Sequence, residues 1–345
     1  MRPANSRKVM KFEIKKQQDN IINYLRESQK PNGEFESLES YPEDHPEAQS
    51  GWRYTDPSPF IHANIIYSLM QIKQPQTRLM VEKGIAFIKS LQENKCFWRF
   101  WPHGGQTHNV PLDMDDTCLC SVILEKNGYN LNNKKILLAN QDERGTFNTW
   151  ILPRRPFIKF PAFYWFLRKD LKKIRPILDS EMLDQHDTEP GVAANVLLYL
   201  GKNPATFKSI GNIILQVKEN EFPLQYYHDP LYTYFHISRA FFAGISSFLE
   251  LKNVIIRSAT DRLENSNSNI FEKIISLLCI LNFGEKDHFM ISPTIDKILE
   301  FSKENEWQSF AYFTSKDKNF RAGSPCLTAS FALEALTKSL RPGAV

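Results

Sequence analysis

The sequence predicts an all-α protein, a single α6/α6 barrel in which six inner helices surround a central cavity and six outer helices enclose them. Two observations lead to this fold. Most segments between Gly, Pro and Asn residues carry apolar side chains at helical spacing, whereas the alternation typical of strands is scarce. A short sequence pattern also recurs along the chain, as it does in arrays of helix pairs. We therefore expect residues 1–345 to form one catalytic barrel domain.

The recurring pattern is an aromatic or aliphatic pair, three residues, Gln, three residues, Gly, one residue and an aromatic. The copies read "YLRESQKPNGEF", "FIKSLQENKCFW", "ILLANQDERGTF" and, in degraded form, "QVKENEF", with glutamines at Gln29, Gln92, Gln141 and Gln216. Each copy is typical of a helix end, because Gly or Asn takes the left-handed conformation after the last turn and the following aromatic packs back onto the helix. The Gln side chain can hydrogen-bond free carbonyls or the first amides of the next helix.

Apolar segments with helical periodicity follow these helix ends, and we predict that they are the inner helices. They begin near Ser58, Asp113, Pro190, Tyr232, Asn269 and Pro325. Each is preceded by a more polar helical segment. The chain therefore contains about six outer and inner pairs, which predicts the α6/α6 barrel.

Composition limits the classes of function. The chain has 345 residues, and 42% of them are hydrophobic, which suffices for a sizeable core. Its 43 basic and 39 acidic residues give a formal charge of +4, too small to indicate nucleic-acid binding. The five cysteines have no disulfide-like spacing and the first residues lack the apolar stretch of a signal peptide, which favours a cytoplasmic location. No run approaches the roughly 18 apolar residues of a membrane span, so we expect any membrane contact to be peripheral.

The stretch "PLDMDDTCLC", residues 111–120, clusters three carboxylates at the start of the second predicted inner helix. An ordinary helix start accounts for two of them, with Asp113 as the N-cap and Asp116 as its partner three residues later. It does not account for Asp115. Clustered carboxylates raise the pKa of one member, so such a group can hold a proton near neutral pH.

The Gln-x3-Gly-x-Trp/Phe repeats, together with an Asp-x-Asp-Asp-Thr motif at the start of an inner helix, resemble the class II terpene cyclases, the hopene and oxidosqualene cyclase superfamily. The resemblance implies the toroid of that superfamily in a single-barrel form. It implies protonation-initiated cyclisation of a linear isoprenoid, either a prenyl diphosphate, a polyprenyl or a meroterpenoid chain. Asp115 would be the general acid, supported by Asp113 and Asp116. Protonation requires no cofactor, and Mg²⁺ has a place only if the substrate carries a diphosphate.

The same resemblance implies further site residues. In hopene cyclases a His on a later inner helix hydrogen-bonds the acid, and the matching stretch "VAANVLLYLG" has Asn195 at that position. The repeat residue Trp98 and the aromatics after it, Phe100 and Trp101, would face the substrate, where aromatic rings stabilise a carbocation. Most relatives enclose the substrate channel between two barrels, whereas this chain has room for one.

The segment "PRRPFIKFPAFYWFLRKDLKKIRP", residues 153–176, interleaves eight cations with six aromatics. It fits a solvated insertion between repeats, a membrane-interface patch, or a diphosphate clamp with Arg154 and Arg155. It lengthens the interval between successive repeat glutamines to 75 residues, against 63 and 49 for the preceding two. We therefore expect it to be the least regular part of the chain.

Two other functions are compatible with the sequence. A zinc prenyltransferase resembling protein prenyltransferase β subunits shares the barrel and takes an Asp-x-Cys pair and a later His as ligands, here Asp116, Cys118 and His186. Such an enzyme would need a partner subunit and has no need for the other two aspartates. A non-catalytic barrel that binds a lipid or a protein is the third possibility.

Overall fold

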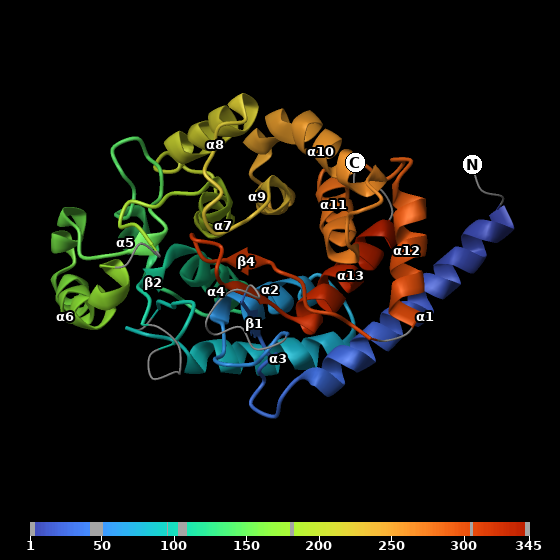
Figure 1. The fold of residues 1–345 in the computed structure, drawn as a ribbon, viewed down its shortest axis with the longest axis horizontal. Coiled ribbons are helices and arrows are strands. Elements are labelled where there is room, and N and C mark those ends of the chain that lie inside the picture. The colour runs from blue at the N-terminus through green and yellow to red at the C-terminus, as the bar shows by residue number, and fades with distance from the viewer. Residues whose placement is uncertain are drawn as a thin grey trace.

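The computed structural model describes residues 4–41, 51–94, 96–102, 109–179, 183–303 and 306–341, and these are mainly helical. The inner helices are α2 (Pro59–Leu69), α4 (Met114–Lys126), α7 (Pro190–Leu200), α9 (Pro230–Phe242), α11 (Ile270–Asn282) and α13 (Pro325–Leu340). Each contacts the next, and α13 contacts α2, so they form a closed ring (Figure 1). Every residue of α2 is buried, as expected for a helix enclosed by protein on all sides.

Outer helices surround this ring in Figure 1. They are α1 (Ala4–Ser28), α3 (Pro75–Ser90), the short α5 (Lys134–Leu138), α8 (Phe207–Glu219), α10 (Lys252–Glu264) and α12 (Ile291–Lys303), with a 3-10 helix, η2 (Ser246–Leu251), before α10. They are amphipathic: on α8 the buried residues Ile210, Ile213 and Val217 follow helical spacing. The predicted all-helical α6/α6 barrel is confirmed.

The inner helices begin at residues with capping side chains or prolines. Ser58 accepts a hydrogen bond from the amide of Ile61, and Asn269 forms a capping box with Glu272. Five of the six predicted starting points agree with these boundaries. The exception is α9, which begins two residues before Tyr232, because Pro at the first helical position extends it.

Two of the four repeat glutamines, Gln29 and Gln141, hydrogen-bond to the start or body of the next outer helix. Gln29 donates from its amide to the carbonyl oxygen of Gly33 in its own repeat and to that of Met80 on α3, both at 2.9 Å. Gln141 does the same for Gly145 and for the start of α8. The repeat glycines have positive φ, +92° at Gly33, as the sequence predicts. A Cβ atom at Gly33 would lie 2.2 Å from the carbonyl oxygen of Lys83, so this position also requires glycine for close helix approach.

A small sheet lies across one end of the barrel, where β4 is seen over the centre of Figure 1. Its strands are β1 (Leu38–Ser40), β5 (Arg321–Gly323) and β4 (Phe313–Thr314), in that antiparallel order. The amide of Thr314 donates to the carbonyl of Tyr226 in the α8–α9 loop, and Lys316 pairs at 2.9 Å with Asp187 in the loop before α7. These two contacts hold the β4–β5 hairpin against both loops. A second pair, β2 (Leu112–Asp113) and β3 (Trp150–Ile151), precedes α4.

The insertion is helical, so the expectation that it would be the least regular part is wrong. It forms a 3-10 helix, η1 (Arg155–Lys159), and α6 (Pro161–Leu178), which lies outside the ring at the left of Figure 1. Phe163 of α6 stacks on Phe97 with ring centroids 4.4 Å apart, and Asp170 pairs with the buried Arg99 at 3.1 Å. These contacts stabilise a helix that the barrel repeat does not require. No described helix is long and apolar enough to cross a membrane.

We predict that Gly33→Ala destabilises the fold more than Gly128→Ala. Both glycines have positive φ, +92° and +86°, but a Cβ at Gly128 meets nothing within 4 Å. Backbone strain alone costs roughly 1–2 kcal/mol, and overpacking against the Lys83 carbonyl adds about 1–3 kcal/mol at Gly33. Urea unfolding followed by circular dichroism measures both variants. Equal losses of unfolding free energy would show that the close approach of α3 contributes nothing.

Candidate active site

The three aspartates of the motif lie at the start of α4, and all are buried. Asp113 is the N-cap: its Oδ1 accepts from the amides of Asp115 and Asp116, at 2.6 and 3.2 Å. The β2–β3 pairing and the bond from the amide of Asp113 to the Trp98 carbonyl hold this cap in place. The cap fixes the other two carboxylates on the first turn, where Asp116 is hydrogen-bonded by the backbone of Phe60 at the start of α2.

Asp115 is bound by side chains from two other parts of the barrel. Asn195 on α7 donates from Nδ2 to its Oδ1 at 2.7 Å. Tyr227, in the loop before α9, donates from its hydroxyl to Oδ2 at 2.5 Å. Sequence analysis associated Asn195 with the acid, and the structure brings the two together. It missed Tyr227, because no repeat or helical period marks a loop residue that lies 112 positions from its partner.

Glu189 holds Tyr227 in position. It precedes α7, is 1% exposed, and accepts from the amides of Tyr226 and Tyr227 at 2.9 and 3.2 Å. Burial raises the pKa of Glu189 to about 8, against the effect of these two hydrogen bonds. Sequence analysis missed Glu189 as well, although an acid directly before the Pro–Gly start of an inner helix was a usable signal.

Burial is the largest cause of the pKa shifts in this cluster. It raises the pKa of Asp115 to about 6, while the hydrogen bonds from Tyr227 and Asn195 lower it. It also raises the pKa of Asp113 and Asp116, and the charges of neighbouring carboxylates raise both further. The sequence-based argument relied on mutual repulsion of the carboxylates, which is therefore the secondary cause. The site favours at least one bound proton among the three acids.

Aromatic rings fill the barrel below and beside the acids. Phe60 lies near the Tyr227 ring, with centroids 6.4 Å apart, and stacks on Tyr312 at 5.7 Å. Tyr312 reaches this position from the residue before β4 and is fully buried. Phe100 stacks on Phe313 at 4.5 Å. The β4–β5 hairpin thus covers the end of the barrel at which α4 begins.

An apolar cleft opens beside this hairpin. Its lining residues are almost all hydrophobic and come from five parts of the chain: Phe100, Trp101, Val110, Trp150, Ile177, Leu183, Tyr226, Phe313, Ser315 and Phe320. Phe100 and Trp101, which the sequence analysis associated with the substrate, both line this cleft. Phe100 contacts Phe60, whose ring lies near Tyr227, so a continuous series of rings connects the cleft with the acid-binding tyrosine.

Three predicted site residues lie elsewhere. Trp98 is buried and donates from its indole to the Ile88 carbonyl at 2.8 Å, so it packs back onto α3, the helix that precedes it. Arg154 donates to the side chain of Asn140 and to the backbone carbonyls of Trp150 and Gln185. Arg155 is exposed at the start of η1. None of the three lines the cleft.

The zinc-ligand set of the alternative function is not assembled. Cys118 is fully buried, and burial followed by the charges of Asp115 and Asp113 raises the pKa of its thiol, which opposes the thiolate that zinc binds. His186 is exposed in the loop before α7. Among the residues that the structure describes, no group of three or more His, Cys, Asp or Glu side chains could hold a metal ion.

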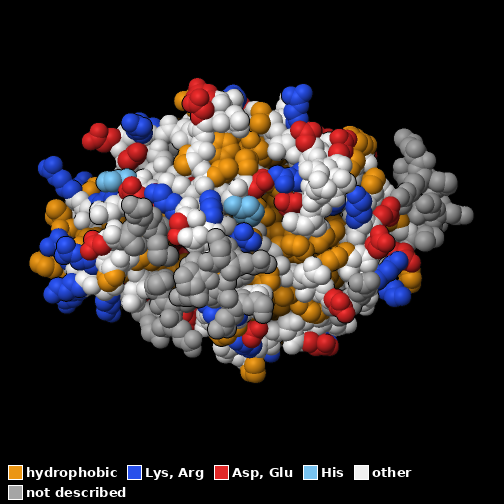
Figure 2. All heavy atoms as spheres, viewed as in Figure 1, with side chains coloured by type: hydrophobic (Ala, Val, Ile, Leu, Met, Phe, Trp, Pro, Cys, Tyr) orange, Lys and Arg blue, Asp and Glu red, His pale blue; other side chains and the backbone are white. Residues whose placement is uncertain are grey.

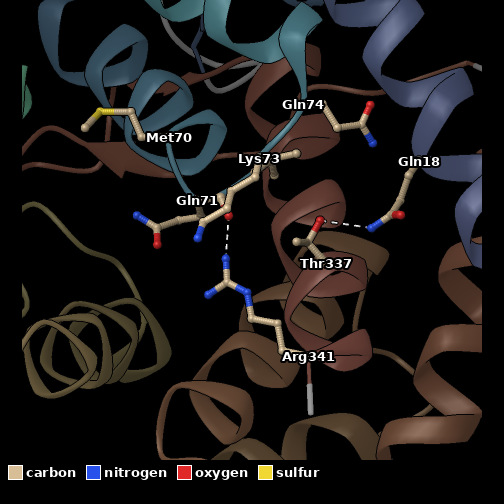
Figure 3. Close-up of a pocket in the computed structure, with 8 residues that line it drawn as sticks. Gln18, Met70, Gln71, Lys73, Gln74, Thr337 and Arg341 are labelled. Atoms are coloured by element: carbon tan, nitrogen blue, oxygen red, sulfur yellow. Dashed lines mark hydrogen bonds between the residues drawn. The ribbon is translucent and has the colours of Figure 1, made fainter. Parts of the chain in front are cut away.

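A larger pocket, with a volume of about 650 Å³, lies at the other end of the inner helices (Figure 3). Residues after the end of α2 and near the end of α13 line it together with Gln18 of α1. Arg341 donates to the carbonyl of Gln71 there, and Gln18 donates to Thr337. The described residues that line it include no Asp or Glu, unlike the opposite end of the barrel, where the three aspartates lie.

The fold was compared with known proteins. No family model and no curated protein matches the sequence. A protein from Actinoplanes has a TM-score of 0.69 at 12% identity, covering 95% of this chain and 100% of its own. Two structures of the type II terpene cyclase MstE from Scytonema, one with geranylgeranyl dihydroxybenzoate as substrate and one with merosterolic acid A as product, have TM-scores of 0.66 and 0.65. Both are 12% identical and cover 96% of this chain and 98% of theirs. The chain therefore has the fold of a type II terpene cyclase.

Proposed function

We propose that the protein is a class II terpene cyclase in which Asp115 protonates the terminal alkene or epoxide of a linear isoprenoid. The observation that carries the proposal is a buried carboxyl with a raised pKa, hydrogen-bonded on both oxygens and connected by aromatic rings to an apolar cleft. The fold supports it, since MstE, a structural neighbour, was solved with an isoprenoid substrate.

The initiating step transfers the Asp115 proton to one alkene carbon. The π electrons form the new C–H bond, the other carbon becomes cationic, and successive alkenes attack it to close rings. Loss of a proton or capture of water ends the sequence. The donor is left as an anion, which the bonds from Asn195 and Tyr227 stabilise because they favour the charged form of Asp115.

Aromatic faces would stabilise the cation after protonation. Phe60 and Phe100 are buried beside the acid end of the barrel, together with Tyr312 and Phe313 from the hairpin. Each desolvated ring facing a cation contributes about 0.5–2 kcal/mol. These rings pack against one another in the described structure, so substrate binding requires the hairpin side chains to shift.

We predict that Asp115→Asn abolishes cyclisation while the protein stays folded. The substitution keeps the size of the side chain but removes the transferable proton, so the rate should fall by at least about 10⁴-fold. Asp113→Asn is the matched control, because Asn also caps helices and the expected effect is much smaller. Chromatography with mass spectrometry on farnesyl diphosphate, geranylgeranyl diphosphate, polyprenyl and prenylated aromatic acid substrates measures product.

Wild-type turnover by a folded Asp115→Asn protein would reject the cyclase assignment. If activity instead required Cys118, with Asp115→Asn nearly silent, the zinc prenyltransferase would replace it. Lipid binding without turnover of any substrate by the wild-type protein would favour the non-catalytic barrel.

We predict that kcat/KM falls as the pH rises through about 6. The acid must carry its proton in the free enzyme, and burial raises the pKa of Asp115 to about 6, so the protonated form is complete below that pH and lost above it. A pH–rate profile of the wild-type enzyme measures the midpoint. A rate that increases with pH over this range would indicate a general base and contradict the assignment.

We predict that Tyr227→Phe moves this midpoint to higher pH. The hydroxyl of Tyr227 lowers the pKa of Asp115, so its removal favours the protonated form, while kcat falls because the anion loses a donor. Tyr226→Phe is the matched control, since the hydroxyl of Tyr226 donates to Asp187 at 2.5 Å. An identical shift in both variants would show that the loop, and not the bond to Asp115, sets the midpoint.

A further inference from the structure

The segment formed by η1 and α6 is strongly basic, whereas the rest of the chain is slightly acidic. Residues 154–178 contain eight Lys or Arg and one Asp, a net charge of +7, whereas the whole chain has +4 and the remainder therefore −3. Figure 2 shows Lys and Arg side chains gathered with hydrophobic ones at the left end of the molecule, where α6 lies in Figure 1. A surface of this kind attracts anions.

The two faces of α6 differ sharply. Phe163, Leu167, Asp170, Ile174 and Ile177 are buried at helical spacing. The exposed residues follow the same spacing on the other side: Trp165, Arg168, Lys169, Lys172 and Lys173. The helix is therefore amphipathic, and its outer face is strongly basic.

Large apolar side chains project from the same region. Trp165 is 64% exposed and Ile158, on the preceding η1, is 57% exposed. Single exposed apolar residues are common. A Trp and an Ile next to a row of cations match a helix that lies in a membrane interface, with aromatics at the acyl boundary and cations at the headgroups.

The helix is fixed to the barrel beside the apolar cleft. Arg99, which is 1% exposed, binds Asp170, and Phe163 packs on Phe97, so the orientation of the basic face is set by the core. Ile177, at the end of α6, and Leu183 line the cleft together with Phe100. The C-terminal end of α6 thus borders the cleft, while its cations lie on the opposite, exposed face of the helix.

We propose that the outer face of α6 docks on an anionic lipid bilayer, and that the apolar cleft beside it receives an isoprenoid chain from that bilayer. The docking follows from the charge and the exposed apolar residues. The transfer of a substrate rests on the proposed cyclase function. The bilayer surface supplies both the negative charge and the apolar layer that this face requires, whereas a free diphosphate would leave Trp165 and Ile158 in water.

Co-sedimentation with phosphatidylcholine vesicles, with and without phosphatidylserine, tests the docking. We expect binding only to the anionic vesicles, and weaker binding at higher salt. Substitution of Arg168, Lys169, Lys172 and Lys173 by Gln should weaken it by about 10²- to 10³-fold, because each cation near an anionic surface contributes roughly fivefold. The matched control replaces Lys11, Lys15, Lys16 and Lys297, which are exposed on α1 and α12, by Gln.

The two variants remove the same charge, so equal weakening would overturn the docking face and indicate only a general effect of charge. Unchanged binding by the α6 variant would overturn it as well. A wild-type protein that ignores vesicles but binds inorganic pyrophosphate through these cations would assign the surface to a diphosphate instead. Trp165→Ala should weaken vesicle binding without changing its salt dependence.

Activity separates this inference from the proposed function. The α6 variant should lose turnover of a polyprenyl substrate presented in anionic vesicles but keep it when the substrate is presented in detergent micelles. Equal turnover in both by the variant would overturn the transfer of substrate from the bilayer. Absence of turnover by the wild-type protein in both would count against the cyclase and leave the vesicle-binding result standing.

Discussion

The loss of water around three carboxylates is the constraint on which the acid end of the barrel depends. Asp113, Asp115 and Asp116 share one helix turn and are all buried, so their charged forms are disfavoured together. Asp113 satisfies two amides of that turn, and Asn195 and Tyr227 satisfy both oxygens of Asp115. One oxygen of Asp116 has no hydrogen-bond partner among the described residues. A proton shared among the three carboxyl groups lowers the free-energy cost of burying them, because it reduces their total negative charge.

At the opposite end of the barrel, a buried acid has a pKa below its ordinary value. Glu334 on α13 is fully buried, yet its pKa is lowered, because the charges of Lys338 and Arg239 and the bonds from Lys338 and Ser68 outweigh the effect of burial. Arg239 is itself held by Asn64 and lies 4.3 Å from the Phe235 ring centroid. Cations thus keep the acid ionised at this end, whereas at the other end burial raises the pKa of Asp115 to about 6 although the hydrogen bonds from Tyr227 and Asn195 lower it. The two ends of the barrel therefore favour different protonation states of a buried acid.

The β4–β5 hairpin covers the acid end of this single barrel. It brings Tyr312 and Phe313 over the ring of inner helices, and Lys318 binds the carbonyls of Leu224 and Gln225 beside the acid-binding loop. The hairpin and Tyr227 are thus parts of one closure. Movement of the hairpin would alter access to the cleft and the support of Asp115 at the same time.

The sequence by itself determined the features that depend on local hydrogen bonds and on helical periodicity. The inner helices, the glutamine-bearing helix ends and the position of Asp113 as a cap follow from neighbouring residues, because caps and apolar stripes form within a few turns. The insertion was misjudged from the long interval that it creates between repeat glutamines, although the spacing of Phe163, Leu167, Asp170 and Ile174 was already that of an amphipathic helix.

Tertiary structure alone decided what surrounds the acid. Tyr227, Glu189 and Tyr312 come from loops and a hairpin without a period, and they meet Asp115 or its partners only because the ring of helices closes. The same holds for Trp98 and Arg154, whose hydrogen bonds within their own surroundings remove them from the cleft. The strength of an acid is likewise a property of the assembled barrel, because burial of Asp115 arises from the packing of segments that are far apart in the chain.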